Sequence, residues 1–196
     1  MSTKLVFATH NQNKFDEVKT MVPDTIELLS LNMIGCHDEI PETGNTLEEN
    51  AQIKANFVTQ NYGLDCFADD TGLLINFLNG EPGVYSARYA GNEKNAEANM
   101  QKVLRQMQNT TNRSARFETV IALNLRQERH FFKGVVEGEI TLKKQGEEGF
   151  GYDPIFRPKG FDKTFAELAF QEKNKISHRA KALEKLVHHL KKYTYV

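Results

Sequence analysis

CFADDTGLL, residues 66–74, places two adjacent carboxylates, Asp69 and Asp70, inside an apolar run. The run predicts a central strand of a sheet that ends near Gly72. Side chains alternate between the faces of a strand, so one aspartate is expected to meet solvent or a metal while the other turns inward. Buried carboxylates need partners, which the rest of the chain must supply. The alternative is a strand-terminating turn, in which Asp and Gly are common.

Strands and helices alternate in the segments around this strand. Helical spacing and extended patterns predict strands at residues 4–9 and 25–31, helices at 11–22, 44–63 and 95–109, a hairpin at 115–142, and a last helix carrying Ile176 to Leu190. The whole pattern predicts an α/β fold: a mixed, twisted central β-sheet flanked by helices, with a long β-hairpin, in a two-lobed single domain with a cleft that covers residues 1–196.

The predicted helix at residues 44–63 has a defined start and two faces. Thr46 and Glu49 fit a capping box. Four apolar residues are expected on its buried face, namely Leu47, Ala51, Ala55 and Val58. Asn50 and Lys54 are expected on the other face.

Composition describes an ordinary globular chain. Of 196 residues, 39% are hydrophobic and 26% charged, with 25 basic against 26 acidic side chains, so we expect no nucleic-acid partner. No run of about 18 apolar residues occurs, so we expect no membrane partner. Cys36 and Cys66 fit no metal or redox spacing, which favours a reduced, cytoplasmic setting.

Two loops could bring polar groups to the central strand. Glu42, in the loop at residues 40–46, is a second carboxylate; taken alone it is more often a solvated residue, but two carboxylates with water and phosphates hold magnesium. Residues 9–14, THNQNK, form a turn whose free amides could bind phosphate at a helix N-terminus. Plain helix capping explains that turn equally well, because the glycines of a Walker loop are missing.

Two later segments carry aromatic and basic residues. In EEGFGYDP, residues 147–154, Phe150 could stack on a base, or be a core residue beside a glycine-rich turn. In EKNKISHRAKAL, residues 172–183, Lys173, His178 and Arg179 surround the start of the last helix, with Ser177 as its cap. Since His178 lies off the apolar stripe of that helix, a packed core histidine is not expected.

Six segments in one order now resemble a known family: FATHNQNK, PETGNTLEENAQIKA, FADDTGL, PGVYSARYAG, GFGYDPIF and AELAFQEKNKISHRAKAL. The set is similar to the inosine triphosphate pyrophosphatases, also called Ham1-like purine nucleoside triphosphate pyrophosphatases, over almost the whole chain. The resemblance implies a magnesium-dependent homodimer that hydrolyses deaminated purine nucleoside triphosphates to the monophosphate and pyrophosphate.

The resemblance also implies roles for individual residues. Asp70 resembles the catalytic base and, with Glu42, a Mg²⁺ ligand. The turn that resembles a triphosphate site comprises Thr9, His10, Asn11, Gln12, Asn13 and Lys14. By the same resemblance, the residues expected to line the substrate pocket are Lys54, Thr71, Phe150, Gly151, Tyr152, Asp153, Lys173, His178 and Arg179. His10 stands where a small residue is common, and Thr71 where serine is frequent.

The chemistry expected of these residues follows from the resemblance. Asp70 would help to deprotonate a water that attacks the α-phosphorus. Lys14, Lys54 and Lys173 would stabilise the departing pyrophosphate, while Asp69 would orient its neighbours or pair with a lysine.

Three alternatives remain at this point. A haloacid-dehalogenase-like phosphatase needs two aspartates separated by one residue, whereas Asp69 and Asp70 are adjacent. A pyrophosphatase for modified pyrimidine nucleotides would use similar chemistry. A nucleotide-binding regulator without turnover belongs to a different class, although every motif carboxylate is present.

Overall fold

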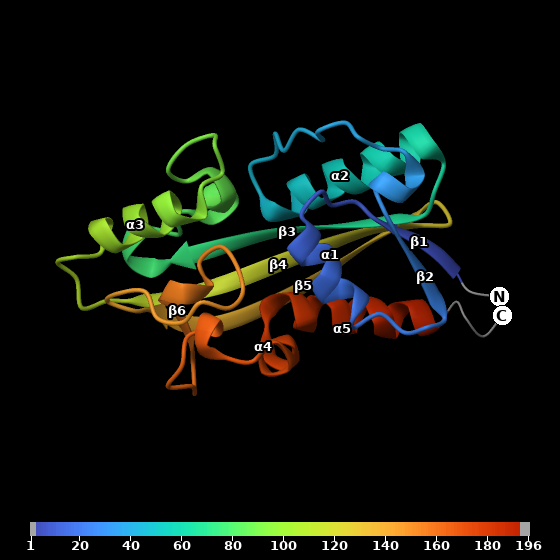
Figure 1. Ribbon diagram of the computed structural model, residues 1–196. Helices are drawn as coiled ribbons and strands as arrows, with labels where there is room; N and C mark the ends of the chain where they lie inside the picture. Colours follow the sequence, from blue (N-terminus) through green and yellow to red (C-terminus); the bar gives the residue numbers. More distant parts are fainter. Residues whose placement is uncertain (1–2, 193–196) are drawn as a thin grey trace. The chain divides into compact units, whose positions relative to one another are not determined.

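The computed structural model describes residues 3–192 and contains a six-stranded mixed sheet (Figure 1). The strands are β1 (Thr3–Phe7), β2 (Ile26–Ser30), β3 (Cys66–Ile75), β4 (Ser114–Leu125), β5 (Glu128–Ile140) and β6 (Phe156–Pro158). They lie in the order β2-β1-β3-β4-β5-β6, with β1 parallel to β2 and β3, and β5 antiparallel to β6. The predicted mixed sheet is thus confirmed.

Strand β3 is longer than the sequence suggested. It runs through Asp69 and Asp70 to Ile75, so the expectation that it ends near Gly72 is wrong. Beyond the glycine the backbone finds new partners: the Leu73 amide donates to Ser86 Oγ at 2.9 Å and the Ile75 amide to the Glu81 carbonyl at 3.2 Å. Because these groups satisfy its amides, the chain stays extended where a turn was the alternative.

The predicted hairpin is β4 and β5. A two-residue turn, Arg126–Gln127, joins the strands. Both residues have positive φ, 49° and 70°, the backbone geometry of tight hairpin turns.

Residues 3–192 contain five α-helices, and the four predicted from the sequence are among them. They are α1 (Gln12–Lys19), α2 (Leu47–Tyr62), α3 (Ala96–Gln106), α4 (Phe170–Ile176) and α5 (His178–Lys191). Asn11, Thr46 and Asn95 cap the first three through side-chain oxygens. The predicted last helix is α5, which begins at His178 directly after Ser177, as expected. Ile176 belongs instead to the preceding helix α4, because Ser177 is extended (ψ 156°) and interrupts the helical bonds between α4 and α5.

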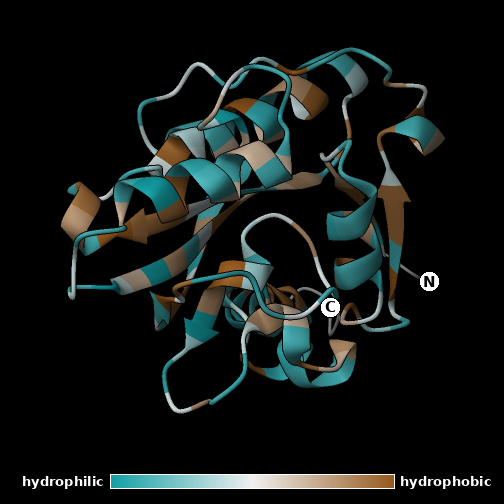
Figure 2. Cartoon of the chain, turned by 60° about the vertical axis from the view of Figure 1, so that its left-hand side comes forward, coloured by the Kyte–Doolittle hydropathy of each residue, from teal (hydrophilic) through white to brown (hydrophobic). Residues whose placement is uncertain are grey.

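Hydrophobic and hydrophilic residues alternate along the helices, as expected where one face is buried (Figure 2). Among residues 3–192, no helix combines the length and apolar character that a bilayer crossing requires.

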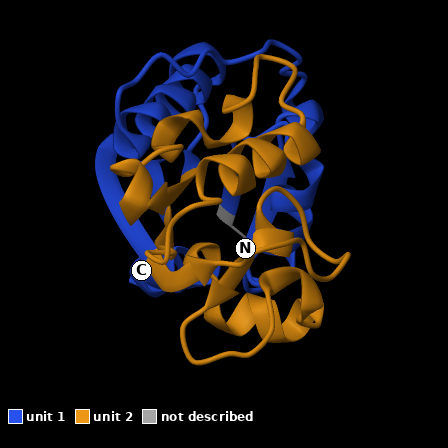
Figure 3. Cartoon of the chain, turned by 90° about the vertical axis from the view of Figure 1, so that its left-hand side faces the viewer, with its two compact units in different colours: residues 1–70, 119–134, 180–196 blue, residues 71–118, 135–179 orange. Residues whose placement is uncertain are grey.

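The chain divides into two compact units (Figure 3). Unit 1 contains residues 1–70, 119–134 and 180–196, and unit 2 contains residues 71–118 and 135–179. Strand β3 contributes to both, because Asp70 ends its part in unit 1 and Thr71 begins its part in unit 2. The assignment of residues 1–196 to a single domain stays a prediction.

Unit 1 buries both faces of its strands. Side chains on one face, including Phe7 and Phe67, pack with α1 and α5. Side chains on the other face, including Val6, Cys66 and Ala68, pack with α2. The alternation along β1 and β3 therefore assigns successive residues to different helical layers.

Unit 2 has its own core, built around aromatic side chains. Phe117 on β4 packs edge to face on Phe156 and stacks against Phe165, with ring centroids 4.7 and 6.1 Å apart. Leu73 and Ile75, at the far end of β3, and Val103 on α3 join the same cluster.

Substitution of Gly138 tests the pairing of β5 with β6. A Cβ built there would lie 2.3 Å from the Arg157 carbonyl oxygen and 2.6 Å from the Phe156 ring, so Gly138→Ala must displace strand β6. We expect the free energy of unfolding in urea to fall by about 1–3 kcal/mol. The exposed neighbour Glu137 provides the control, Glu137→Ala, and equal stability losses in both variants would contradict this account.

Candidate active site

Asp69 and Asp70 point to opposite faces of β3, and each meets a lysine of the helix on its face. Following the alternation from Phe67, Asp69 falls on the α1 side and Asp70 on the α2 side. Lys14 Nζ from α1 lies 3.0 Å from Asp69 Oδ1, and Lys54 Nζ from α2 lies 3.7 Å from Asp70 Oδ1. The predicted opposite orientation, and a lysine partner for Asp69, are confirmed.

Lys54 joins two carboxylates from distant parts of the chain. Its ammonium lies 2.5 Å from Glu42 Oε1 as well as beside Asp70. All three side chains are largely buried, which strengthens their attraction because little water screens it. The carboxylates of Glu42 and Asp70 therefore converge on the same ammonium group, that of Lys54.

The expectation that Lys54 and Asn50 lie opposite the apolar face of α2 is wrong. Positions three and four apart share a helix face, so one buried stripe includes both kinds of residue. Its members are Leu47, Asn50, Ala51, Lys54, Ala55 and Val58. Lys54 can be buried because Glu42 and Asp70 neutralise it.

Burial and charge shift the titration of this cluster. Burial raises the pKa of Asp70 above its ordinary value, although Lys54 and Lys14 oppose that rise. For Lys54, burial lowers the pKa, but Asp70 and Glu42 outweigh it and the net direction is upward. Lys54 thus stays protonated, and Asp70 is a stronger base than an exposed aspartate.

The turn at residues 9–14 follows β1 and caps α1. Thr9 Oγ1 accepts from the Asn11 amide at 3.2 Å, and Asn11 Oδ1 accepts from the Lys14 amide at 3.2 Å. Gln12 and Asn13 are exposed. Helix capping is therefore confirmed as the role of the Asn11 side chain, while Lys14 is the residue that reaches the carboxylates.

His10 links this turn to the loop that carries Glu42. Its Nε2 lies 2.8 Å from the Asp38 carbonyl oxygen. Two segments with predicted substrate or metal residues are thereby held side by side within unit 1.

Asn50 is a site residue that the sequence reasoning missed. It is fully buried, and its Oδ1 accepts from the Gly44 amide at 2.8 Å, two residues beyond Glu42. Its position one helical turn before Lys54 is the signal that could have found it.

In unit 2, Asp153 organises the turn that carries Phe150. Asp153 Oδ2 accepts from the Phe150 amide at 2.9 Å and from Lys173 Nζ at 2.7 Å. Gly149 allows this approach, because its φ is +75° and a Cβ there would lie 2.2 Å from Asp153 Oδ2. Asp153 thus fixes both the backbone of the turn and the buried ammonium of Lys173.

Cations flank the Phe150 ring. Lys173 Nζ lies 4.8 Å and Arg179 Cζ 5.6 Å from its centroid. Arg179, itself buried, donates to Thr71 Oγ1 at 3.4 Å. The structure thereby brings Thr71, Phe150, Lys173 and Arg179 together within unit 2.

Two other residues predicted for the pocket turn into the core of unit 2. His178 stacks on Phe117, with centroids 4.6 Å apart, so the expectation that it is not a packed core histidine is wrong. The packing arises because α5 begins anew at His178 after the break at Ser177, which changes the face that the stripe presents. Tyr152 is also buried and donates from its hydroxyl to the Ser86 carbonyl at 2.8 Å.

Glu42 and Asp70 are the residues that could hold a divalent cation. Their convergence on the Lys54 ammonium shows that this place already favours positive charge. Among residues 3–192 no group of three or more His, Cys, Asp or Glu forms a metal cage. Two carboxylates completed by water and phosphate oxygens suit Mg²⁺, which keeps much of its hydration shell.

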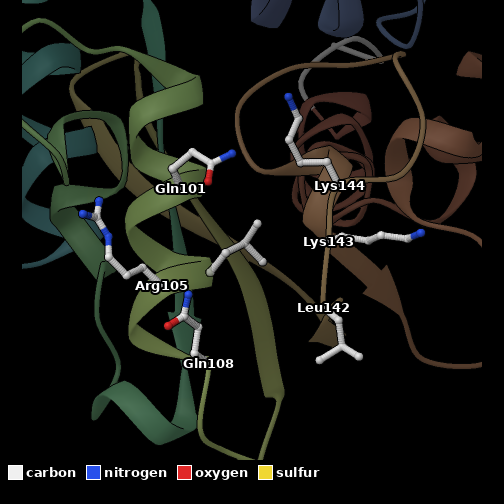
Figure 4. A pocket seen from close by; sticks show the side chains of 7 residues that line it. Gln101, Arg105, Gln108, Leu142, Lys143 and Lys144 are labelled. Carbon is white, nitrogen blue, oxygen red and sulfur yellow. The ribbon is translucent and has the colours of Figure 1, made fainter.

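Two hollows of the surface lie away from these residues. One of about 580 Å³ in unit 2 is bordered by α3 and the segment after β5 (Figure 4). Arg105 and Lys143 there point away from each other, so they do not converge on a ligand. Another of about 760 Å³ in unit 1 is lined chiefly by α5. Neither contains a residue predicted for the site.

Comparisons with known proteins agree over nearly the whole chain. Residues 5–189 match the model of the Ham1 family. The dITP/XTP pyrophosphatase of Christiangramia forsetii is 59% identical, over 96% of this chain and 100% of its own. The one of Porphyromonas gingivalis is 48% identical, over 93% and 95%.

Solved structures give the same result. The Ham1 protein of Staphylococcus aureus superposes with a TM-score of 0.89 at 42% identity, over 97% of this chain and 100% of its own. A nucleoside-triphosphatase described as a dITP/XTP pyrophosphatase, from Mycobacterium abscessus, has a TM-score of 0.78 at 39% identity, over 94% and 99%.

The raised pKa of Asp70 gives the stability of the protein a pH dependence. Because the folded state holds the Asp70 proton more tightly than the unfolded chain, this group's stabilising contribution is full at low pH and is lost as the pH rises through the folded pKa. Asp70→Asn removes that loss. The stability of the variant relative to wild type should therefore increase from acid to neutral pH, measured by urea unfolding.

An exposed carboxylate provides the control for this titration. Asp16→Asn replaces an exposed aspartate on α1, so this substitution removes no buried carboxylate. If the stability difference between Asp70→Asn and wild type does not change with pH, burial does not govern the charge of Asp70.

Proposed function

The chain belongs to the Ham1 family, and from that membership we propose that it hydrolyses deaminated purine nucleoside triphosphates, such as dITP, ITP and XTP, to the monophosphate and pyrophosphate. It is a hydrolase of nucleoside triphosphates that removes these nucleotides from the nucleotide pool. The observation that carries the proposal is the sharing of the buried Lys54 ammonium by Glu42 and Asp70, beside the Lys14–Asp69 pair.

Unit 1 provides the groups for the triphosphate. The amides of Gln12 and Asn13, at the N-terminus of α1, suit phosphate oxygens, whereas those of Asn11 and Lys14 take part in capping. Lys14 and Lys54 are positive and largely buried, so they can stabilise the charge that develops on the departing pyrophosphate. Lys173 packs instead with Asp153 and Phe150, and we assign it to the other end of the substrate.

Glu42 and Asp70 would hold Mg²⁺ together with phosphate oxygens. When bound, the ion neutralises phosphoryl charge and lowers the pKa of water. Lys54, which contacts both carboxylates, would lie beside the ion and could pair with a phosphate oxygen.

Asp70 accepts the proton of the water that attacks the α-phosphorus. Burial raises the pKa of its carboxyl, which makes the carboxylate more basic than an exposed one, although Lys54 and Lys14 oppose that rise. Asp69, which faces the α1 side, positions Lys14.

Unit 2 provides the groups for the base. The Phe150 ring can stack on a purine, and Lys173 and Arg179 lie where donors can meet a 6-oxo group. Gly151, next in the chain, leaves the backbone of the turn accessible. Adenine presents a 6-amino donor instead, so a buried donor would be left unmatched at a cost of about 1–3 kcal/mol.

The oligomeric state and setting belong to the same proposal. The family resemblance supports a homodimer that acts in the cytoplasm, with a small-molecule nucleotide as substrate and neither nucleic acid nor membrane as partner.

Product analysis with ITP and Mg²⁺ tests the function. We expect inosine monophosphate and pyrophosphate, and a fall in kcat of at least about 10³-fold in Asp70→Asn with binding of a non-hydrolysable ITP analogue preserved. Orthophosphate would point to a phosphatase, and binding without product to a regulator. Faster turnover of modified pyrimidine nucleotides would move the chain to a pyrimidine enzyme.

The stacking role of Phe150 has its own test. Phe150→Ala should weaken binding of ITP by about 1–3 kcal/mol, seen as a raised KM, because the base loses its aromatic contact. Phe161, an exposed phenylalanine of the same unit, provides the matched control, Phe161→Ala. An unchanged KM in Phe150→Ala would remove Phe150 from the base site.

A further inference from the structure

The amide side chain of Asn50 stands between the Glu42 loop and Asp70. Asn50 is fully buried on α2, one turn before Lys54. Its Oδ1 accepts from the Gly44 amide at 2.8 Å, so one end of the side chain holds the loop two residues beyond Glu42.

The loop can approach Asn50 only because residue 44 is glycine. A Cβ built on Gly44 would lie 2.8 Å from Asn50 Oδ1 and 2.6 Å from Glu49 Cβ. Any larger residue would push the loop, and Glu42 with it, away from α2. The side chains of Thr46 and Glu49 fix the loop's exit, since Glu49 Oε2 accepts from the Asn45 amide at 2.6 Å.

The other end of the Asn50 amide faces the aspartate. Asn50 Nδ2 is buried, and the Asn50 side chain interacts with the carboxylate of Asp70, which also contacts Lys54 one turn further along α2. Because Nδ2 is a hydrogen-bond donor and Oδ1 an acceptor, one Asn50 side chain can orient the Asp70 carboxylate while it holds the loop.

We propose that Asn50 is a positioning residue that sets the distance between Glu42 and Asp70, and so prepares the two carboxylates to share a divalent cation. The need for a divalent cation comes from the proposed function. The position of Asn50 between the two carboxylates comes from its contacts with Gly44 and Asp70. Asn50 contacts neighbours of the reacting atoms and does no chemistry itself. Groups that orient metal ligands in this way typically change metal affinity about 10–100-fold when removed.

Direct Mg²⁺ binding tests the inference. Isothermal titration calorimetry would measure Mg²⁺ affinity in the presence of an ITP analogue with a methylene bridge between the α- and β-phosphates. We expect Asn50→Ala to weaken Mg²⁺ binding about 10–100-fold. Gly44→Ala should do the same by displacing the loop from the opposite side, and it keeps the test valid if Asn50→Ala folds poorly.

A matched control separates positioning from general stability. Asn99 in unit 2 is also buried, and its Oδ1 accepts from the Ala90 loop amide at 2.6 Å, so Asn99→Ala removes the same kind of bond away from the carboxylates. Thermal unfolding of each variant accompanies the titrations. Asn99→Ala should lose stability and keep the wild-type Mg²⁺ affinity.

Two results would overturn the inference: wild-type Mg²⁺ affinity in both Asn50→Ala and Gly44→Ala, or a loss in Asn99→Ala that matches theirs. The fate of the proposed function is read separately, from wild-type product analysis. Pyrophosphate release with unaltered Mg²⁺ binding in the variants would reject the role of Asn50 alone. Absence of product from the wild type would reject the function, while the affinities would still report on Asn50.

Discussion

Alternation of side chains along a buried strand imposes the main constraint on this protein. Asp69 and Asp70 are adjacent in β3, so their carboxylates enter different helical layers. Both layers are apolar, and each must therefore provide a cation: Lys14 comes from α1 and Lys54 from α2. A slip of one residue in the register of β3 would exchange the two faces and leave both pairs broken, so the site and the sheet specify each other.

Such an arrangement is a costly way to stabilise a fold. Buried ion pairs often contribute less than well-packed apolar side chains, because both charges lose their hydration. Here Lys54 is shared by two acids, and Asp70 keeps a pKa above its ordinary value. Clusters of this kind are typical of functional sites, where a carboxylate must be available to a cation or a proton. The cost is understandable if the acids serve a substrate that brings further charge.

In unit 2, a buried carboxylate paired with a lysine holds an aromatic residue in place. Asp153 binds the Phe150 amide and the Lys173 ammonium with one oxygen, so the turn and its cation form a single rigid group. Gly149 is the residue that permits this contact, because a side chain would collide with the carboxylate. The aromatic core behind it, with His178 stacked on Phe117, supports the group from within.

The sequence by itself determined the succession of the longer strands and helices along the chain, the mixed sheet, and the opposite directions of Asp69 and Asp70, because periodicity and capping are local. Its motifs, by resemblance, indicated the family. It did not determine the end of β3, where the distant Ser86 and Glu81 supply partners past Gly72. Nor did it reveal the burial of Lys54, Asn50 and His178. Those outcomes depend on neutralising or stacking groups from other segments, and only the tertiary structure decides which segments meet.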